Sequence, residues 1–248
     1  MLTSCRKSRS GKGDKGGRVP ANPVDANPTP DTEQTPFSTE LRQATWSDHG
    51  DAEQQGFVQA LLDGTLPRAA YAAMLAQHHF VYAALEEVGR TLAEDPLAGR
   101  IHFPALSRVP ALHRDLTALY GPDWRDRVFP TPPTRAYTAR IEGTAADPAR
   151  YVAHHYTRYM GDLSGGRFLR RAAERAYGID ADSGTAFFDF PGLGSLLRFK
   201  DGYRRRLDEL DLDAAARRRV VAETRLAYRL NAEVLADLGR THAGGRAA

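Results

Sequence analysis

The sequence predicts an all-α protein built as a single multi-helix domain. From Phe37 onward, apolar residues recur with a period near 3.6 residues, which is the spacing of one helix face. Runs that alternate at every second residue, as half-buried strands do, are almost absent. Apolar residues make up 42% of the 248 residues, and a chain of this length can bury the core of one large domain.

Proline and polar residues mark the expected helix boundaries in the first half of the chain. The first helix is expected to begin near Ser38, a residue type that favours the N-cap. A long helix follows, with Pro67 in its first turn and Pro96 just past its end. The next helical segment contains Pro104 and Pro110, so we expect it to be broken or kinked there.

The second half of the chain predicts three further helices. One has Asp147 as N-cap and Pro148 in its first turn, and it stops at Gly178. Another covers GLGSLLRFKDGYRRRLDEL, and the last is capped by Asp213 and ended by Gly239. The longest irregular connection is expected at DADSGTAFFDFPG.

Both ends of the chain are expected to lie outside this domain. Residues 1–36 lack apolar periodicity and are rich in Gly, Pro, Ser, Asn and charged residues, which is typical of a disordered tail. Residues 241–248 are short and polar and are expected to be a frayed tail. The predicted domain therefore covers residues 37–240.

Charge and composition exclude several classes of protein. Six of the 34 basic side chains lie in residues 1–18, together with one acidic side chain. The rest of the chain therefore carries 28 basic and 30 acidic side chains and is close to neutral. This charge gives little reason to expect nucleic acid as a partner. Cys5 is the single cysteine, which excludes an intrachain disulfide and a cysteine-based metal site. No run of 18 apolar residues and no apolar leader is present. We therefore expect a cytoplasmic protein without a membrane anchor.

One segment weakens an otherwise good helix. GDLSGG, at residues 161–166, places three glycines in the run YVAHHYTRYMGDLSGGRFLRRAAERAYG, and each interior glycine costs roughly 1 kcal/mol relative to alanine. Because residues four apart share a helix face, Gly161 and Gly165 form one stripe without Cβ atoms, and Asp162 lies on the adjoining face. Two interpretations stay open. The stripe allows either close packing of a second helix or a flat ligand against the backbone.

A second segment offers a partner for such a ligand. In LRQATWSDHGDAE, Arg42 lies seven residues before His49 and Glu53 lies four residues after it, so all three share roughly one helix face. A neutral imidazole can bind a metal, and a nearby carboxylate can orient it. A lone histidine on a helix is more often an ordinary packed or solvated side chain, so that alternative also stays open.

Taken together, the two segments make the sequence resemble the heme oxygenase family, which degrades heme to biliverdin. YTRYMGDLSGGRFLRRAA resembles the distal-helix signature of the family, and LRQATWSDHGDAE resembles its proximal-helix segment. FVYAALEEVGR, FKDGYRRRLDEL and RLNAEVLADL occur in matching order and spacing. The resemblance covers roughly residues 38–239 and implies a fold in which heme is held between a proximal and a distal helix. The absence of a hydrophobic C-terminal anchor points to a soluble, bacterial form.

The resemblance also implies roles for individual residues. His49 would be the axial ligand of the heme iron, with Glu53 as its neighbour. The residues implied to act on the distal side are Asp162, Arg158, Tyr82 and Asn231. The residues implied to bind heme are Arg42, Tyr156, Gly161, Gly165, Lys200 and Arg204.

Helical spacing gives part of this picture independently. Lys200 and Arg204 are four residues apart and project together, which suits a contact with carboxylates. Arg158 and Asp162 are also four residues apart, and a simple ion pair on a helix face is the alternative to a buried role.

Two pairs of histidines lie near these segments. Neighbours on a helix point about 100° apart, so at most one residue of His78 and His79, and one of His154 and His155, can face the ligand. We interpret His154 and His155 as structural.

The activity that the resemblance implies is the oxidative cleavage of heme to biliverdin, CO and ferrous iron. Heme would be both substrate and prosthetic group, and O₂ would be the co-substrate. The electron donor would be a ferredoxin or a flavin-containing reductase. The alternative is a heme carrier or sensor that keeps the fold without turnover, but a carrier needs neither Asp162 nor the bare stripe beside it.

Overall fold

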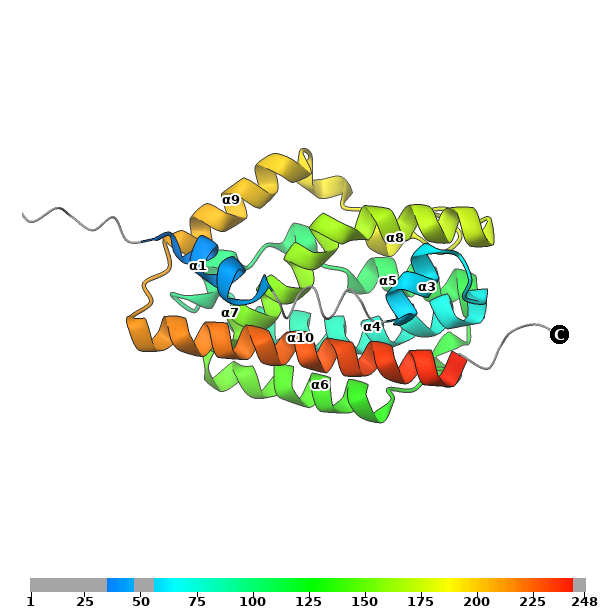
Figure 1. The fold of residues 1–248 in the computed structure, drawn as a ribbon, viewed down its shortest axis with the longest axis horizontal. Coiled ribbons are helices and arrows are strands. Elements are labelled where there is room, and N and C mark those ends of the chain that lie inside the picture. Colours follow the sequence, from blue (N-terminus) through cyan, green and yellow to red (C-terminus); the bar gives the residue numbers. More distant parts are fainter. Residues whose placement is uncertain (1–34, 47–55, 243–248) are drawn as a thin grey trace, which may run out of the picture. The chain divides into compact units, whose positions relative to one another are not determined.

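The computed structural model describes residues 35–46 and 56–242 of the chain. Thr35–Ala248 form one compact unit, and its described part contains helices and no strand (Figure 1). The all-α prediction is therefore confirmed. None of the described helices combines the length and the apolar character needed to cross a membrane. The α-helices are α1 (Phe37–Ala44), α3 (Gly56–Leu62), α4 (Arg68–Thr91), α5 (Val109–Tyr120), α6 (Pro132–Glu142), α7 (Pro148–His155), α8 (Gly161–Tyr177), α9 (Leu196–Asp208) and α10 (Ala214–His242).

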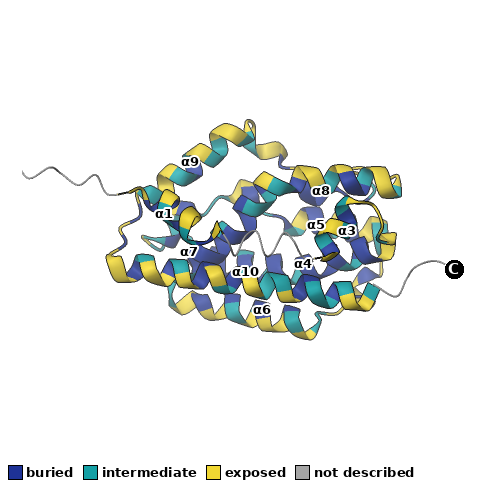
Figure 2. Ribbon diagram, in the orientation of Figure 1, coloured by how far each residue is buried: buried dark blue, intermediate teal, exposed yellow. Residues whose placement is uncertain are grey.

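The core forms where the long helices meet. Helix α10 packs against α6 and α7, and α4 packs against α5 and α6. Buried residues gather along these contacting faces, as the dark blue stretches of α4, α7 and α10 show in Figure 2. Leu75, Val152 and Ala227 are examples that are completely buried. Removal of this apolar surface from water is the main force that holds the helices together.

The predicted helix boundaries are confirmed at several positions. Asp213 caps α10, because its Oδ1 accepts a hydrogen bond from the Ala216 amide at 2.6 Å. Gly178 ends α8 in the left-handed conformation, with φ 63°. Pro110 lies in the first turn of α5, and Pro104 begins a short 3₁₀ turn before it, so the chain is broken between them as predicted.

Several predicted boundaries are wrong. Pro67 is the N-cap residue of α4 and lies just before its first turn, and α4 ends at Thr91, well before Pro96. Helix α1 begins at Phe37 after Pro36, and Ser38 lies inside its first turn. The Ser38 amide donates to Asp208 Oδ1 at 2.7 Å, so α9 supplies the acceptor. Helix α10 does not end at Gly239 but continues to His242, and a Cβ at Gly239 would make only ordinary contact with Phe57, at 3.8 Å.

The helix that carries GDLSGG is not a uniform α-helix. It begins at Pro148 as predicted, but a π-helical turn, η5 (Tyr156–Met160), separates α7 from α8. The Thr157 hydroxyl donates to the Ala153 carbonyl at 2.8 Å within this bend. Asp147 occupies the predicted N-cap position without a side-chain cap, because its carboxylate pairs with Arg150 at 3.3 Å instead.

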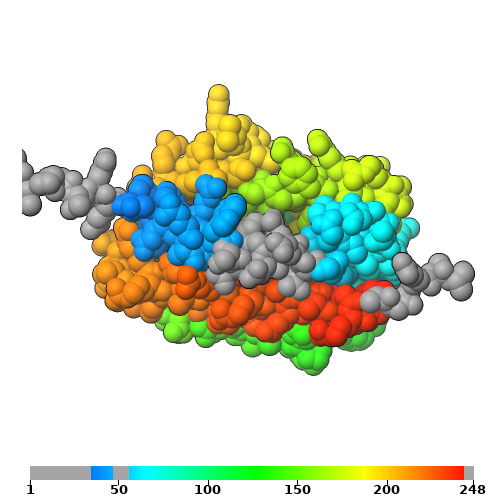
Figure 3. Space-filling view, viewed as in Figure 1, coloured from blue at the N-terminus to red at the C-terminus, as the bar shows by residue number. Residues whose placement is uncertain are grey.

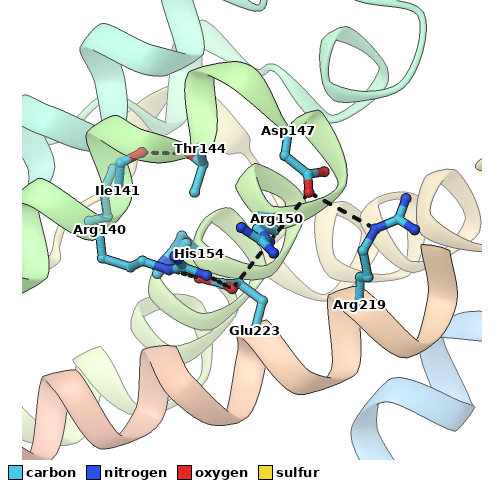
Figure 4. A network of polar contacts seen from close by, with 8 residues as sticks. All are labelled: Arg140, Ile141, Thr144, Asp147, Arg150, His154, Arg219 and Glu223. Carbon is cyan, nitrogen blue, oxygen red and sulfur yellow. Dashed lines mark hydrogen bonds and ion pairs between the residues drawn. The ribbon is translucent and has the colours of Figure 1, made fainter. Parts of the chain in front are cut away.

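A buried ion-pair network fixes α7 to its neighbours (Figure 4). Glu223 on α10 accepts a hydrogen bond from Arg140 Nε on α6 at 2.6 Å and lies 2.9 Å from His154 Nε2 on α7. Burial alone would raise the pKa of Glu223, but its hydrogen bonds with His154 and Arg140 lower it to about 2. On another side of α7, His155 Nδ1 bonds the Tyr203 hydroxyl of α9 at 2.8 Å. Both histidines are buried in packing contacts, as the structural interpretation predicted.

Candidate active site

A cavity of about 500 Å³ lies between α3, α4, α10 and the segment formed by η5 and α8. Figure 3 shows α3 (cyan) against α8 (yellow-green) and α10 (red) on the face in view, and these helices are in contact. Met74, Leu169 and Leu235 contribute apolar wall, whereas Arg158 and Asp162 contribute charge. This size and mixture are typical of a small-molecule site.

The three glycines of GDLSGG do not share one role. Gly161 and Gly165 line the cavity, and a Cβ added to either would meet no atom of the described residues within 4 Å. A Cβ on Gly166 would lie 3.2 Å from Phe188 Cδ1. Gly166 also lines the cavity but is closely packed against Phe188, whereas Gly161 and Gly165 have open space above the helix backbone among the described residues.

Four of the predicted residues form one hydrogen-bonded chain at the cavity. The Tyr82 hydroxyl donates to the Asp162 carboxylate and accepts from Arg158 Nε at 3.3 Å. Arg158 Nη1 donates to the side-chain carbonyl of Asn231. Helices α4, α8 and α10 and the turn η5 each contribute one member, so the packing of these elements sets the geometry.

The electrostatic environment of Asp162 follows from its burial. Burial raises its pKa, whereas the Arg158 guanidinium and the hydrogen bond from Tyr82 oppose that rise. The pKa of the Tyr82 hydroxyl is raised well above 10.0, again mainly by burial, so it stays a donor. No direct ion pair between Arg158 and Asp162 is present in the described structure, because Tyr82 lies between them. The alternative of a simple exposed pair is therefore wrong, and Arg158 is only 6% exposed.

A second group of predicted residues gathers around Tyr156. Burial raises the pKa of its hydroxyl, and the charges of Arg204 and Arg42 oppose that rise. The structure thus brings α1, η5 and α9 together here. Arg204 pairs with Asp201 at 2.8 Å, and Lys200, one turn earlier, has no ion pair within the described part of the chain.

Two predicted residues cannot be placed. His49 and Glu53 fall outside the described residues, so their positions relative to the cavity stay predictions.

Sequence reasoning missed two residues beside the hydrogen-bonded chain. His78 lines the cavity one turn before Tyr82 on α4, and the sequence shows it only as half of a histidine pair. The Tyr159 ring packs edge-on against Tyr82 with centroids 5.6 Å apart. Nothing in the local sequence distinguishes Tyr159 from an ordinary core aromatic residue.

Comparison with known proteins decides the family. The sequence model of heme oxygenases matches residues 35–237. A heme oxygenase of Rhodella violacea is 36% identical over 82% of this chain and 87% of its own length. The chain belongs to the heme oxygenase family. Its fold also matches heme oxygenase-1 of Synechocystis sp. PCC 6803 in complex with heme, with a TM-score of 0.81, 35% identity, and coverage of 84% of this chain and 95% of that one.

A further heme oxygenase structure agrees with this assignment. The enzyme of Leptospira interrogans has a TM-score of 0.78 and 32% identity, and covers 82% of this chain and all of its own. The family and fold predictions from the sequence are therefore confirmed.

Proposed function

We propose that this heme oxygenase cleaves heme to biliverdin, CO and ferrous iron, with O₂ as co-substrate and heme as both substrate and prosthetic group. One observation carries the proposal: a carboxylate held by Tyr82 lies beside a helix face that Gly161 and Gly165 leave bare. Open space above a backbone suits a flat ring, and the apolar wall of the cavity suits its faces. The cavity therefore fits the substrate.

The remaining predicted residues bind and orient the substrate. We assign His49 as the ligand of the iron, with Glu53 beside it, from the resemblance alone. Arg42, Lys200 and Arg204 supply cations for the two propionates, and Tyr156 supplies a hydroxyl. The effect of Arg42 and Arg204 on the pKa of Tyr156 supports their grouping on one side of the site.

The distal residues control protons and water. Bound heme supplies the iron that activates O₂ and the ring that is oxidised. Asp162 holds water in the cavity and passes a proton through it, because a raised pKa makes the carboxyl a usable acid. Tyr82 fixes the carboxyl, and Arg158 limits the rise of its pKa. Asn231 in turn holds the Arg158 guanidinium.

The bare helix face lets oxidation occur at the edge of the ring. Side chains at Gly161 and Gly165 would fill the space that the described residues leave above the backbone. The roughly 2 kcal/mol that these two glycines cost the helix is offset when the apolar faces of the substrate are buried.

The finer assignments rest on the sequence. We propose a ferredoxin or a flavin-containing reductase as electron donor and a cytoplasmic location. We also propose residues 37–240 as the catalytic domain, with tails at 1–36 and 241–248.

An absorption time course tests the function. The purified protein is mixed with one equivalent of hemin, and ascorbate, or ferredoxin with its reductase, is added in air. We expect a sharp heme band that decays into the broad red absorption of biliverdin. A band that persists under every reductant would indicate the carrier or sensor instead, and the absence of a heme band would contradict heme binding.

A further inference from the structure

His78 is a polar residue in the cavity wall that the proposed function does not use. The residue is 8% exposed, and its ring packs beside two aromatic rings that also contact each other, with centroid separations of 6.3 Å to Tyr82 and 5.4 Å to Phe187. Its Nδ1 is buried and has no hydrogen-bond partner in the described structure. No hydrogen bond of Nε2 is present there either, and the residue lines the cavity.

An unpartnered polar group at such a position calls for an explanation. Buried polar atoms nearly always have partners, and orphaned ones destabilise the fold. Met74, one turn earlier on α4, shows that an apolar side chain can line the same wall. An apolar residue would therefore serve packing at position 78 at least as well as histidine.

The chemistry of the imidazole restricts what it can bind. Burial and the charge of Arg158 lower the pKa of His78 well below 6.5, so the ring is neutral. A neutral imidazole donates one hydrogen bond and accepts one. This pattern suits water or a small neutral or anionic ligand, and it does not suit a role as a charged anchor.

The Asp162 carboxyl lines the same cavity and can also bind a water molecule. Tyr82, one helical turn after His78, already bonds the Asp162 carboxylate, so both His78 and Asp162 flank one tyrosine. Building on the function proposed above, we propose that His78 is a further positioning residue, which together with Asp162 holds a water molecule in the cavity. When a small ligand enters, the same imidazole contacts it.

Three variants separate this role from a packing role. His78→Leu removes the hydrogen-bonding capacity, and His78→Gln retains it. His79→Leu is the matched control, because His79 is the next residue on α4 and also has an orphaned Nδ1. Its ring packs against His113 and Trp124, both with centroids 5.0 Å away, and it does not line the cavity.

The first readout needs no heme. In ¹⁵N-histidine-labelled full-length protein, we expect nuclear Overhauser contacts between bound water and the His78 ring, and their weakening in Asp162→Ala. A His78 ring without water contacts in the wild-type protein would overturn the proposal.

The second readout is azide affinity of the ferric, hemin-loaded protein, measured by absorption titration. Loss of one hydrogen bond of about 1 kcal/mol predicts about fivefold weaker binding in His78→Leu. His78→Gln and His79→Leu should stay within about twofold of the wild type. Unchanged affinity in His78→Leu, or an equal loss in His79→Leu, would overturn the proposal. Failure of the wild type to bind hemin would instead contradict the proposed function, and the heme-free readout would still test His78.

Discussion

The Tyr82 hydroxyl donates its hydrogen bond to the Asp162 carboxylate and so links helix α4 to the first turn of α8. The same hydroxyl accepts from Arg158 Nε at 3.3 Å, and Tyr82 is completely buried. The orientation of the distal carboxyl therefore depends on a residue 80 positions away in the chain.

Replacement of Tyr82 by phenylalanine tests this link. Hemin binding should be retained, but biliverdin formation should slow by about tenfold, because a hydrogen bond to a charged group is lost. The hydrogen bond lowers the pKa of Asp162, so its loss should raise that pKa and move the alkaline limb of the rate profile, where the carboxyl loses its proton, to higher pH. Tyr71→Phe is the control, since it removes a buried hydrogen bond on α4 to the Gly184 carbonyl away from the cavity. Equal slowing in both variants would contradict the link.

Substitution of Gly165 should raise stability while it lowers hemin affinity. A Cβ meets open space among the described residues, so Gly165→Ala should stabilise the heme-free protein by about 1 kcal/mol through helix propensity. Gly165→Leu should weaken hemin binding at least about tenfold, because its side chain occupies the cavity. Urea unfolding and hemin titration measure the two effects. Gly143→Ala, at an exposed position by the end of α6, should leave hemin affinity unchanged.

Glu223 should be essential for stability because it is a buried anion among cations. Glu223→Gln leaves Arg140 with a neutral partner in the network of Figure 4 and should destabilise the protein by about 3 kcal/mol in urea unfolding. Glu233→Gln is the matched control on the same helix, at an exposed position. Its effect should stay within about 0.5 kcal/mol. Similar values for the two variants would show that the network contributes little.

The buried His155 ring should make the stability of the protein depend on pH. Burial lowers its pKa from 6.5 to about 3, so the folded protein keeps the ring neutral while the unfolded chain takes up a proton below pH 6.5. The part of the unfolding free energy that depends on the neutral His155 ring is complete above pH 6.5. As the pH falls from 6.5 towards 3, this part decreases by about 1.4 kcal/mol per pH unit. Between pH 6 and 4.5, unfolding free energies of His155→Phe should therefore fall less steeply than those of the wild type, by about that slope. Parallel slopes would contradict the assignment.

The helical architecture was predictable because its signals are local. Asp213 and Gly178 act within one turn of the helices they bound, so the sequence alone identifies them. Ser38 was misassigned because its partner, Asp208, lies on another helix. Helices α3 and α6 and the π turn at Tyr156–Met160 were not predicted, since their formation depends on packing that a local pattern does not record.

The candidate site was predictable in part for the same reason. Spacing alone groups Gly161 with Gly165, and the structure places both on the cavity. Spacing does not show that Tyr82 stands between Arg158 and Asp162, because that contact joins two helices. The cavity position of His78 is likewise a product of tertiary packing.

The most direct test of the central claim compares wild type with Asp162→Asn in single-turnover reactions. Both proteins are loaded with one equivalent of hemin, reduced in air, and analysed for biliverdin by chromatography. Asparagine keeps the size of the side chain and an acceptor for Tyr82 but removes the acid. We predict the same heme band before reduction in both proteins, and biliverdin from the wild type only. A normal yield of biliverdin from Asp162→Asn would contradict the role of this carboxyl in heme cleavage.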